Sequence, residues 1–169
     1  MPTARARSRP VSVQTRGRRL PPDIFDLPVE KMREGYYTDE YFNQTRRVLL
    51  EDGRHPRVVM QVFQKKTSLL AGIDEAIAII KLCSEDWQGL TVHALYEGDE
   101  ISPWETVMTI EGDYTGFAHL ETLYLGVLAR RTMIATNVKR VVEAANGKPI
   151  IFMPARYDHH RVQTGDGFA

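Results

Sequence analysis

Apolar residues recur at three- and four-residue spacing along residues 116–147. The positions are Leu120, Leu123, Tyr124, Val127, Leu128, Met133, Ile134, Val138, Val141 and Val142. This spacing places one apolar stripe on a helix of about eight turns, or on two shorter consecutive helices. Asn146 and Gly147 mark its end, because both residues tolerate the left-handed backbone conformation that closes helices. We therefore expect the rest of the fold to pack on this stripe.

Before this stretch, some segments show helical spacing of apolar residues and others show strand spacing. We expect helices over 26–35, 38–50 and 72–83, and strands over 57–67, 90–96 and 104–111. The strand over 57–67 should be buried mostly on one face, since apolar residues fill alternate positions. The helix over 38–50, capped by Thr38 or Asp39, carries an aromatic stripe in which Tyr41 either packs in a core or interface or stacks on a ligand. Strands with helices on one side form a sandwich.

A short apolar run over 149–153 follows the helix stop and indicates a buried strand. A helix that feeds a β-branched strand is how an α/β barrel begins, and in such folds ligands bind beyond the carboxyl ends of strands. Four donor-bearing side chains stand at this place: Arg156, His159, His160 and Arg161. They form either an anion site or a solvated loop. Zinc is disfavoured, because adjacent histidines in an extended segment point to opposite faces.

Charge is distributed unevenly along the 169 residues. Residues 1–19 hold six arginines and no acid, which leaves 16 basic and 22 acidic residues, a balance of −6, in the other 150. An acidic body argues against nucleic acid as the main partner. We expect residues 1–22 to be a disordered basic tail rather than a nucleic-acid-binding arm, because they have almost nothing to bury.

Neither a membrane span of about 18 apolar residues nor a secretory signal is found in the sequence. The single Cys83 excludes an internal disulfide and a four-thiolate metal site, and we expect it to be a small core residue. These features favour a soluble protein of the reducing cytoplasm, with no membrane partner.

Local catalytic motifs are absent. The sequence has no Walker loop, no dinucleotide-binding glycine pattern, no nucleophile elbow and no zinc-protease motif. The segment 97–113 has the Gly-Asp turns of a lipoyl or biotinyl carrier, but Met108 is followed by Thr109 and not by the lysine that bears the cofactor. His55, His93 and His119 stand alone and are expected to be structural.

The order of several short motifs resembles the nicotinate phosphoribosyltransferase family and, more distantly, quinolinate phosphoribosyltransferase. These motifs are Gly35-Tyr-Tyr-Thr-Asp-Glu-Tyr-Phe-Asn-Gln-Thr45, Glu97-Gly-Asp, Ile110-Glu-Gly-Asp-Tyr114, His119-Leu-Glu-Thr-Leu-Tyr-Leu-Gly126, Ile134-Ala-Thr136 and the run to Met153 with Arg156. The resemblance covers roughly residues 23–169. It implies an α+β fold: an N-terminal α/β sandwich of type II phosphoribosyltransferases over 23–147, then the first strand of an incomplete α/β barrel over 148–169.

The resemblance also implies a chemistry. Enzymes of this family join nicotinate and phosphoribosyl pyrophosphate into nicotinate mononucleotide in NAD salvage, and Mg²⁺ and ATP are implied for the complete enzyme. Tyr41 matches the tyrosine that stacks on the pyridine ring from a neighbouring subunit, and Arg156 matches the arginine at the end of the first barrel strand. Quinolinate enzymes carry Glu-Arg where this chain has Glu121-Thr122, which favours nicotinate because that ring has one carboxylate fewer.

Family members are about twice as long as this chain. We therefore expect either a fragment or one half of a split enzyme, inactive alone, with a homodimer or a complementing C-terminal half as its partner. Two alternatives stay open: a non-catalytic binding or interaction module that keeps the sandwich, and a quinolinate phosphoribosyltransferase-like enzyme of de novo NAD synthesis.

Overall fold

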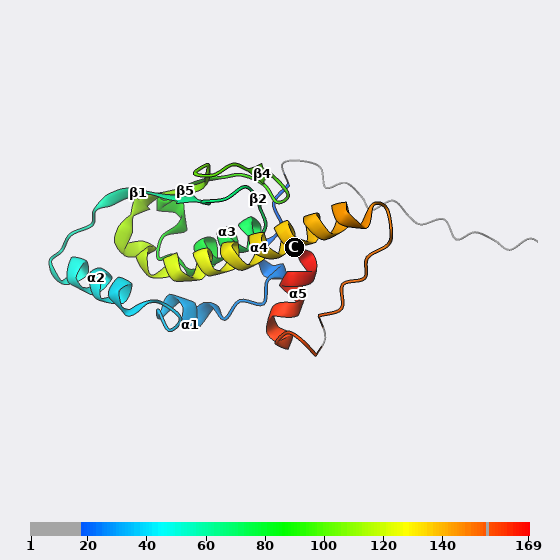
Figure 1. Ribbon diagram of the computed structural model, residues 1–169. Coiled ribbons are helices and arrows are strands. Elements are labelled where there is room, and N and C mark those ends of the chain that lie inside the picture. The colour runs from blue at the N-terminus through cyan, green and yellow to red at the C-terminus, as the bar shows by residue number, and fades with distance from the viewer. Residues whose placement is uncertain (1–17, 155) are drawn as a thin grey trace, which may run out of the picture.

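The computed structural model describes residues 18–154 and 156–169. Figure 1 shows an antiparallel sheet on one side and helices on the other. The elements, with short 3₁₀ turns between them, are α1 (Val29–Arg33), α2 (Glu40–Glu51), β1 (Arg57–Phe63), β2 (Ser68–Leu69), α3 (Ile73–Cys83), β3 (Thr91–Ala94), β4 (Glu100–Ile101), β5 (Thr106–Asp113), α4 (Glu121–Ala145) and α5 (His160–Phe168). Each helix and strand expected before residue 148 is present, and the expected α+β sandwich is confirmed.

Two antiparallel sheets make the strand layer. The larger has the order β1-β5-β3, and the smaller pairs β2 with β4. In β1, Val62 is buried on the helix side, whereas Val59 on the opposite side is 63% exposed. This confirms that β1 is buried mostly on one face, because only that face has helices packed on it.

The hydrophobic core lies between the large sheet and helices α3 and α4. Its most deeply buried members include Ile73, Ile79, Ile80, Cys83, Met108, Ile110, Phe117, Leu120 and Tyr124. Burying one such large apolar side chain contributes about 1.5–3 kcal/mol, so these contacts are the main source of stability. Cys83 occupies the core as expected.

Helix α4 runs for 25 residues and ends where the sequence indicates. Asn146 and Gly147 both have a positive φ, of 48° and 81°. The helix buries Tyr124 and Leu128 in its first half, but Val138 and Val141 near its end are exposed. The expectation that the whole stripe is packed is therefore wrong for the second half, because α4 extends beyond the sheet there (Figure 1).

The expected strand over 149–153 is not formed. These residues are in no helix or strand, and their side chains are exposed, Ile151 by 79%. A β-branched run gives a strand only when another strand can pair with it, and the described residues place none beside it. This part of the expected barrel start is therefore wrong for the chain as it stands.

Part of the expected basic tail contacts the body. Arg19 donates to the Asp74 carboxylate at 3.0 Å and to the Ala94 carbonyl at 2.8 Å, and it lies over the ring of Tyr96. The Leu20 amide donates to the same carboxylate at 2.9 Å. The expected disorder is therefore wrong for Arg19 and Leu20, while residues 1–17 lie outside the described part of the chain. No helix in that described part has the length and hydrophobicity to cross a bilayer.

Candidate functional site

Tyr41 lies in the first turn of α2 and is 60% exposed. Its ring centroid is 4.1 Å from that of Phe42, which is buried. Phe42 thus fixes the helix on the body while Tyr41 presents its ring outward. This exposure excludes the core-packing interpretation of Tyr41 and leaves an interface or a stacked ligand.

The start of α2 is pinned to the start of α4. Thr122 Oγ1 donates to Asp39 Oδ2 at 2.9 Å and accepts from the Asp39 amide at 3.2 Å. The Thr38 hydroxyl donates to the His119 carbonyl. Asp39 is the residue before α2, but its side chain makes no capping hydrogen bond and turns to Thr122 instead. These contacts hold the residues around Tyr41 at a fixed place.

Carboxylates shape the electrostatics around Tyr41. Desolvation, and to a smaller extent the negative charge of Asp39, raises the pKa of Glu121. Partial desolvation, followed by the negative charges of Asp39 and Glu121, raises the pKa of Tyr41. The phenol therefore stays neutral at physiological pH. A neutral aromatic ring can stack on an uncharged planar group. An anionic group placed beside this ring would be repelled by the neighbouring carboxylates.

The basic end of the expected site lies around the start of α5. Arg156 is exposed with φ 78°, and Arg161 is also exposed. His159 Nδ1 accepts from the Arg161 amide at 3.2 Å and so caps α5. The rings of His159 and His160 stack with centroids 4.3 Å apart. The expectation that they point to opposite faces is wrong, because a helix begins at His160 and the segment is not extended there.

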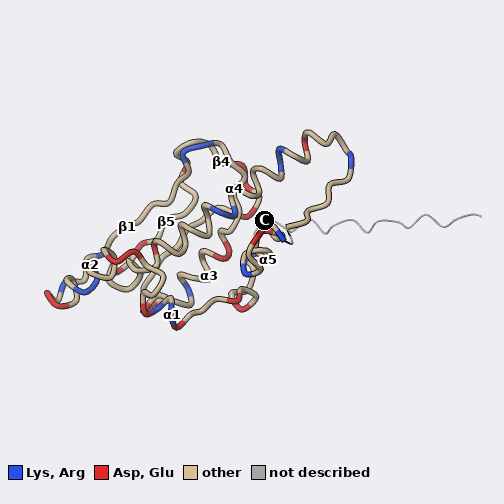
Figure 2. Tube along the Cα trace, turned by 60° about the horizontal axis from the view of Figure 1, so that its bottom comes forward, with Lys and Arg blue, Asp and Glu red and all other residues tan. Residues whose placement is uncertain are grey.

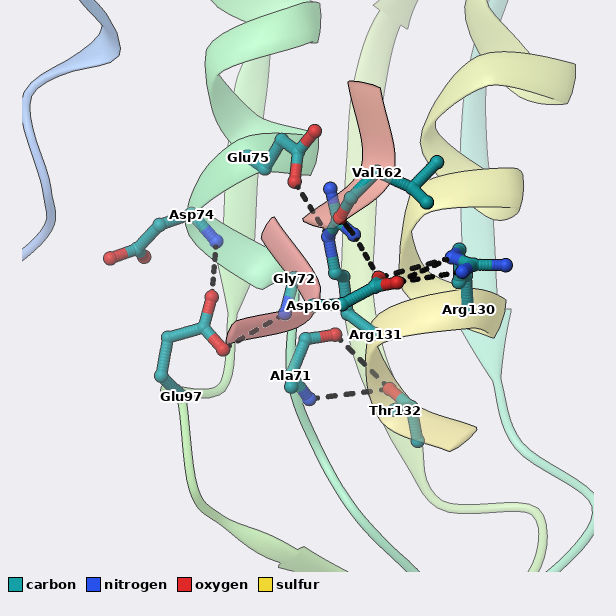
Figure 3. A network of polar contacts seen from close by, with 10 residues as sticks. All are labelled: Ala71, Gly72, Asp74, Glu75, Glu97, Arg130, Arg131, Thr132, Val162 and Asp166. Carbon is teal, nitrogen blue, oxygen red and sulfur yellow. Dashed lines mark hydrogen bonds and ion pairs between the residues drawn. The ribbon is translucent and has the colours of Figure 1, made fainter. Parts of the chain in front are cut away.

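A buried carboxylate fastens α5 to α4 (Figure 3). Arg130 Nε donates to Asp166 Oδ1 at 3.0 Å and Arg130 Nη2 donates to Oδ2 at 2.6 Å, while Arg131 Nη1 also donates to Oδ1, at 2.5 Å. Arg131 Nε also bonds Glu75 of α3 at 3.1 Å. Burial alone would raise the pKa of Asp166, but hydrogen bonds and charge from Arg130 and Arg131 lower it. The network therefore holds the basic end on the body.

Arg131 fits between two glycines. A Cβ on Gly72 would lie 2.7 Å from Arg131 Cγ, and a Cβ on Gly165 would lie 1.8 Å from Arg131 Nη2. Gly72 also has φ 86° and donates its amide to Glu97 at 2.9 Å. Any larger residue at these two places would push the guanidinium away from Asp166.

The two ends of the expected site do not meet in one chain. Figures 1 and 2 both place α2, which carries Tyr41, and α5, which follows Arg156, at opposite ends of the molecule. The structure thus brings the rings of His159 and His160 together. Arg156 is near them in the sequence, whereas Tyr41 is on the distant helix α2. A ligand that touches Tyr41 and Arg156 would have to lie between two chains.

The surroundings of several polar residues could not be predicted from the sequence. His55 Nδ1 lies 2.7 Å from Asp113 Oδ2, and both line a hollow of about 300 Å³ with Arg46 and Glu85. His119 is fully buried, and neither ring nitrogen has a hydrogen-bond partner among the described residues. The expectation of a satisfied structural histidine is therefore wrong for His119. Only adjacent Arg130 and Arg131 in an apolar helix could have drawn attention in the sequence.

No group of three or more His, Cys, Asp or Glu side chains that could hold a metal ion is found in residues 18–154 and 156–169.

Comparison with known families matches residues 39–132 to the family described as quinolinate phosphoribosyl transferase, N-terminal domain. Among curated proteins, the chain is similar to nicotinate phosphoribosyltransferase pncB1 of Mycobacterium tuberculosis, with 37% identity over 65 residues. That match covers 38% of this chain and 14% of the relative. The matched stretch is thus a small part of the relative's length.

Two solved structures are similar in fold. Nicotinate-nucleotide pyrophosphorylase from Pyrococcus furiosus aligns with a TM-score of 0.71 and 29% identity, over 82% of this chain and 36% of that one. Human nicotinic acid phosphoribosyltransferase aligns with a TM-score of 0.63 and 18% identity, over 73% and 32%. The chain therefore corresponds to about a third of the length of these proteins.

Proposed function

Because this chain belongs to the quinolinate phosphoribosyltransferase N-terminal domain family, we propose that it forms the N-terminal part of a nicotinate phosphoribosyltransferase. The proposed reaction joins the pyridine nitrogen of nicotinate to the anomeric carbon of phosphoribosyl pyrophosphate and releases pyrophosphate. The product is nicotinate mononucleotide. Since the aligned part of the chain spans only about a third of the two solved structures named above, we propose that it is inactive alone and needs groups from a further segment or chain.

The exposed ring of Tyr41 supports the binding of nicotinate in this proposal. Its exposed ring, held beside buried Phe42, can stack on the flat face of a pyridine ring. Stacking would orient the ring nitrogen toward the anomeric carbon, and such orientation lowers the barrier to a displacement. Tyr41 needs no proton transfer for this role, which agrees with its raised pKa.

Arg156 supports the binding of an anionic group of the substrates. Its exposed guanidinium can bind the carboxylate of nicotinate or a phosphate of the second substrate in a forked geometry. His159, His160 and Arg161 follow it within five residues of the sequence and would add donors. Since α2, which carries Tyr41, and α5, which follows Arg156, lie at opposite ends of the molecule (Figure 1), the proposed site forms where Tyr41 of one subunit meets Arg156 of another, or where a complementing half supplies the missing wall.

The Thr122–Asp39 hydrogen bond is the observation that favours nicotinate over quinolinate. Quinolinate carries two carboxylates, and the second needs a cationic partner. At the place that the resemblance assigns to an arginine, this chain has Thr122, whose hydroxyl is 2.9 Å from Asp39 Oδ2. Two acids, Asp39 and Glu121, lie beside Tyr41 and would repel a second carboxylate.

Mg²⁺ and ATP belong to this proposal only for the assembled enzyme. When bound, the metal would neutralise the leaving pyrophosphate. The described residues bring no suitable set of ligands together, so the residues of this chain are assigned orientation and anion binding only.

Product formation tests the proposal directly. The purified chain, alone and mixed with a complementing C-terminal half, would be incubated with phosphoribosyl pyrophosphate and either nicotinate or quinolinate, and mononucleotide would be measured by chromatography. We expect nicotinate mononucleotide only in the mixture. Turnover of quinolinate alone would instead support the de novo alternative, and absence of both turnover and binding would support a non-catalytic module.

A further inference from the structure

A shallow polar groove runs between the loop after β1 and the middle of α4. It is lined by Gln64, Lys66, Thr67, Ser68, Asn137 and Arg140. Two adjoining hollows of about 210 Å³ each make up this α4 groove, and they share Thr67, Ser68, Thr136 and Arg140. Figure 2 shows basic residues both on the loop that follows β1, close to β4, and along α4. None of the groove residues belongs to the site proposed above.

Two of the three cations that line the α4 groove, Lys66 and Arg140, have no acidic partner in the described part of the chain. Among the described residues, neither Lys66 nor Arg140 makes an ion pair. The nearest acids that line the groove are Glu100 and Glu143, and both pair with Lys139, Glu143 at 3.9 Å. Lys66 and Arg140 therefore both face the hollow that no described acid lines, while Glu100 and Glu143 face the adjoining hollow with Lys139. This basic hollow lies on a body whose residues 20–169 carry a net charge of −6.

Uncharged donors surround these two cations. Gln64 Oε1 accepts from the Lys65 amide at 2.6 Å, which leaves the Gln64 amide nitrogen without a hydrogen-bond partner in the described part of the chain. The side chains of Asn137 and Thr67 also line the hollow. The hydroxyls of Ser68 and Thr136 are engaged, since they donate to the carbonyls of Lys66 and Thr132. The hollow thus offers two cationic donors and three neutral ones.

We propose that the α4 groove binds a doubly charged tetrahedral oxyanion, either free inorganic phosphate or the phosphate group of a small phosphorylated metabolite. Arg140 would bind two oxygens in a fork, Lys66 would supply a point charge, and Asn137, Gln64 and Thr67 would bind the remaining oxygens. The site lies on α4 and uses neither Tyr41 nor Arg156. It therefore does not depend on the proposed transferase activity.

Titration with inorganic phosphate tests this inference on the intact chain. Backbone amide NMR would be recorded with sodium phosphate, with chloride adjusted to keep ionic strength constant. We expect saturable shifts at the amides of Thr67, Ser68 and Asn137. Arg140→Gln should weaken binding at least fivefold, and Arg140→Lys should restore part of it. Both changes are at an exposed position, and circular dichroism would verify that the fold is retained.

Lys81→Gln is the matched control, because Lys81 is an exposed cation on α3 outside the groove. It should leave the phosphate affinity unchanged. Competition by glucose 6-phosphate at the same amides would identify a phosphorylated metabolite as the ligand class, and its absence would identify free phosphate. Shifts that rise linearly with phosphate, or an affinity equal in wild type and Arg140→Gln, would overturn the inference. This experiment does not measure nicotinate binding. If phosphate does not bind, the proposed function is therefore unaffected.

Discussion

The guanidinium of Arg130 donates to the buried carboxylate of Asp166 with Nη2 and Oδ2 2.6 Å apart. Through this contact the last helix of the chain is held on the longest one. Arg131 adds a second pair and extends the network to Glu75 of α3. The basic residues at the start of α5 thereby have a defined position relative to the core.

Asp166→Asn should release α5 from α4. The amide cannot neutralise two guanidinium groups, and Arg131 is largely buried, so we expect a loss of about 2 kcal/mol. Hydrogen exchange of the amides in α5 would measure it. Asp158→Asn, at an exposed carboxylate 3.5 Å from Arg130, should change stability by less than about 0.5 kcal/mol. Equal protection of α5 in Asp166→Asn and wild type would show that the network does not hold the helix.

Gly72→Ala should destabilise the protein by about 2–3 kcal/mol. The change strains a backbone with φ 86° and places a Cβ 2.7 Å from Arg131 Cγ. Gly98→Ala is the matched control, because Gly98 has φ 81° but nothing within 4 Å of the added carbon. It should cost only about 1 kcal/mol, the strain alone. Urea unfolding of both variants would separate strain from the collision, and equal losses would contradict a role for Arg131 packing.

His119 should make stability fall in mild acid. Desolvation, with a further contribution from Arg46, lowers the pKa of His119 to about 4. The unfolded chain takes up a proton below about pH 6.5, whereas the folded chain does not until about pH 4. Between pH 7 and pH 5 the folded state should therefore lose about 2 kcal/mol relative to a chain without this histidine.

Urea unfolding of His119→Leu at pH 7 and pH 5 would measure that difference. The variant should lose less stability on acidification than wild type. His93→Leu is the matched control for replacing a histidine by leucine, because His93 is exposed on β3 whereas His119 is buried. If His119→Leu and wild type lose the same stability, His119 is not held neutral in the folded state.

Tyr41→Ala should weaken nicotinate binding in the assembled enzyme about fivefold to tenfold, since loss of one aromatic stack costs about 1 kcal/mol. The melting temperature of the chain should hardly change, because Tyr41 is exposed. Tyr36→Ala removes another exposed tyrosine near α2 and should leave binding unchanged. Tyr41→Phe should bind nicotinate as wild type does. Unchanged affinity in Tyr41→Ala, measured by calorimetry, would remove Tyr41 from the site.

The sandwich could be predicted from the sequence because the spacing of apolar residues within each segment indicates a helix or a strand. The spacing of Leu120, Tyr124 and Leu128 predicts the packed half of α4, and Asn146-Gly147 predicts its end. Alternation over 57–63 likewise predicts β1 and its two faces. These patterns depend only on near neighbours in the chain, so no long-range contact had to be known.

The other features depend on contacts that local patterns do not contain. Asp166 pairs with Arg130 across 36 residues, and nothing in the spacing of either residue indicates that pairing. Residues 149–153 have the composition of a strand, but a strand also requires a neighbour to pair with. The separation of α2, which carries Tyr41, from α5, which follows Arg156, likewise follows from tertiary packing (Figure 1).

The contact between Arg19 and Asp74 sets where the protein can be shortened. Asp74 is 6% exposed, and its carboxylate accepts from Arg19 and from the Leu20 amide. A version that starts at Pro21 would leave this acid buried without its cation, which favours poor expression and aggregation of the recombinant product. A version that starts at Arg18 keeps the contact, so it is the better starting point for crystallisation trials.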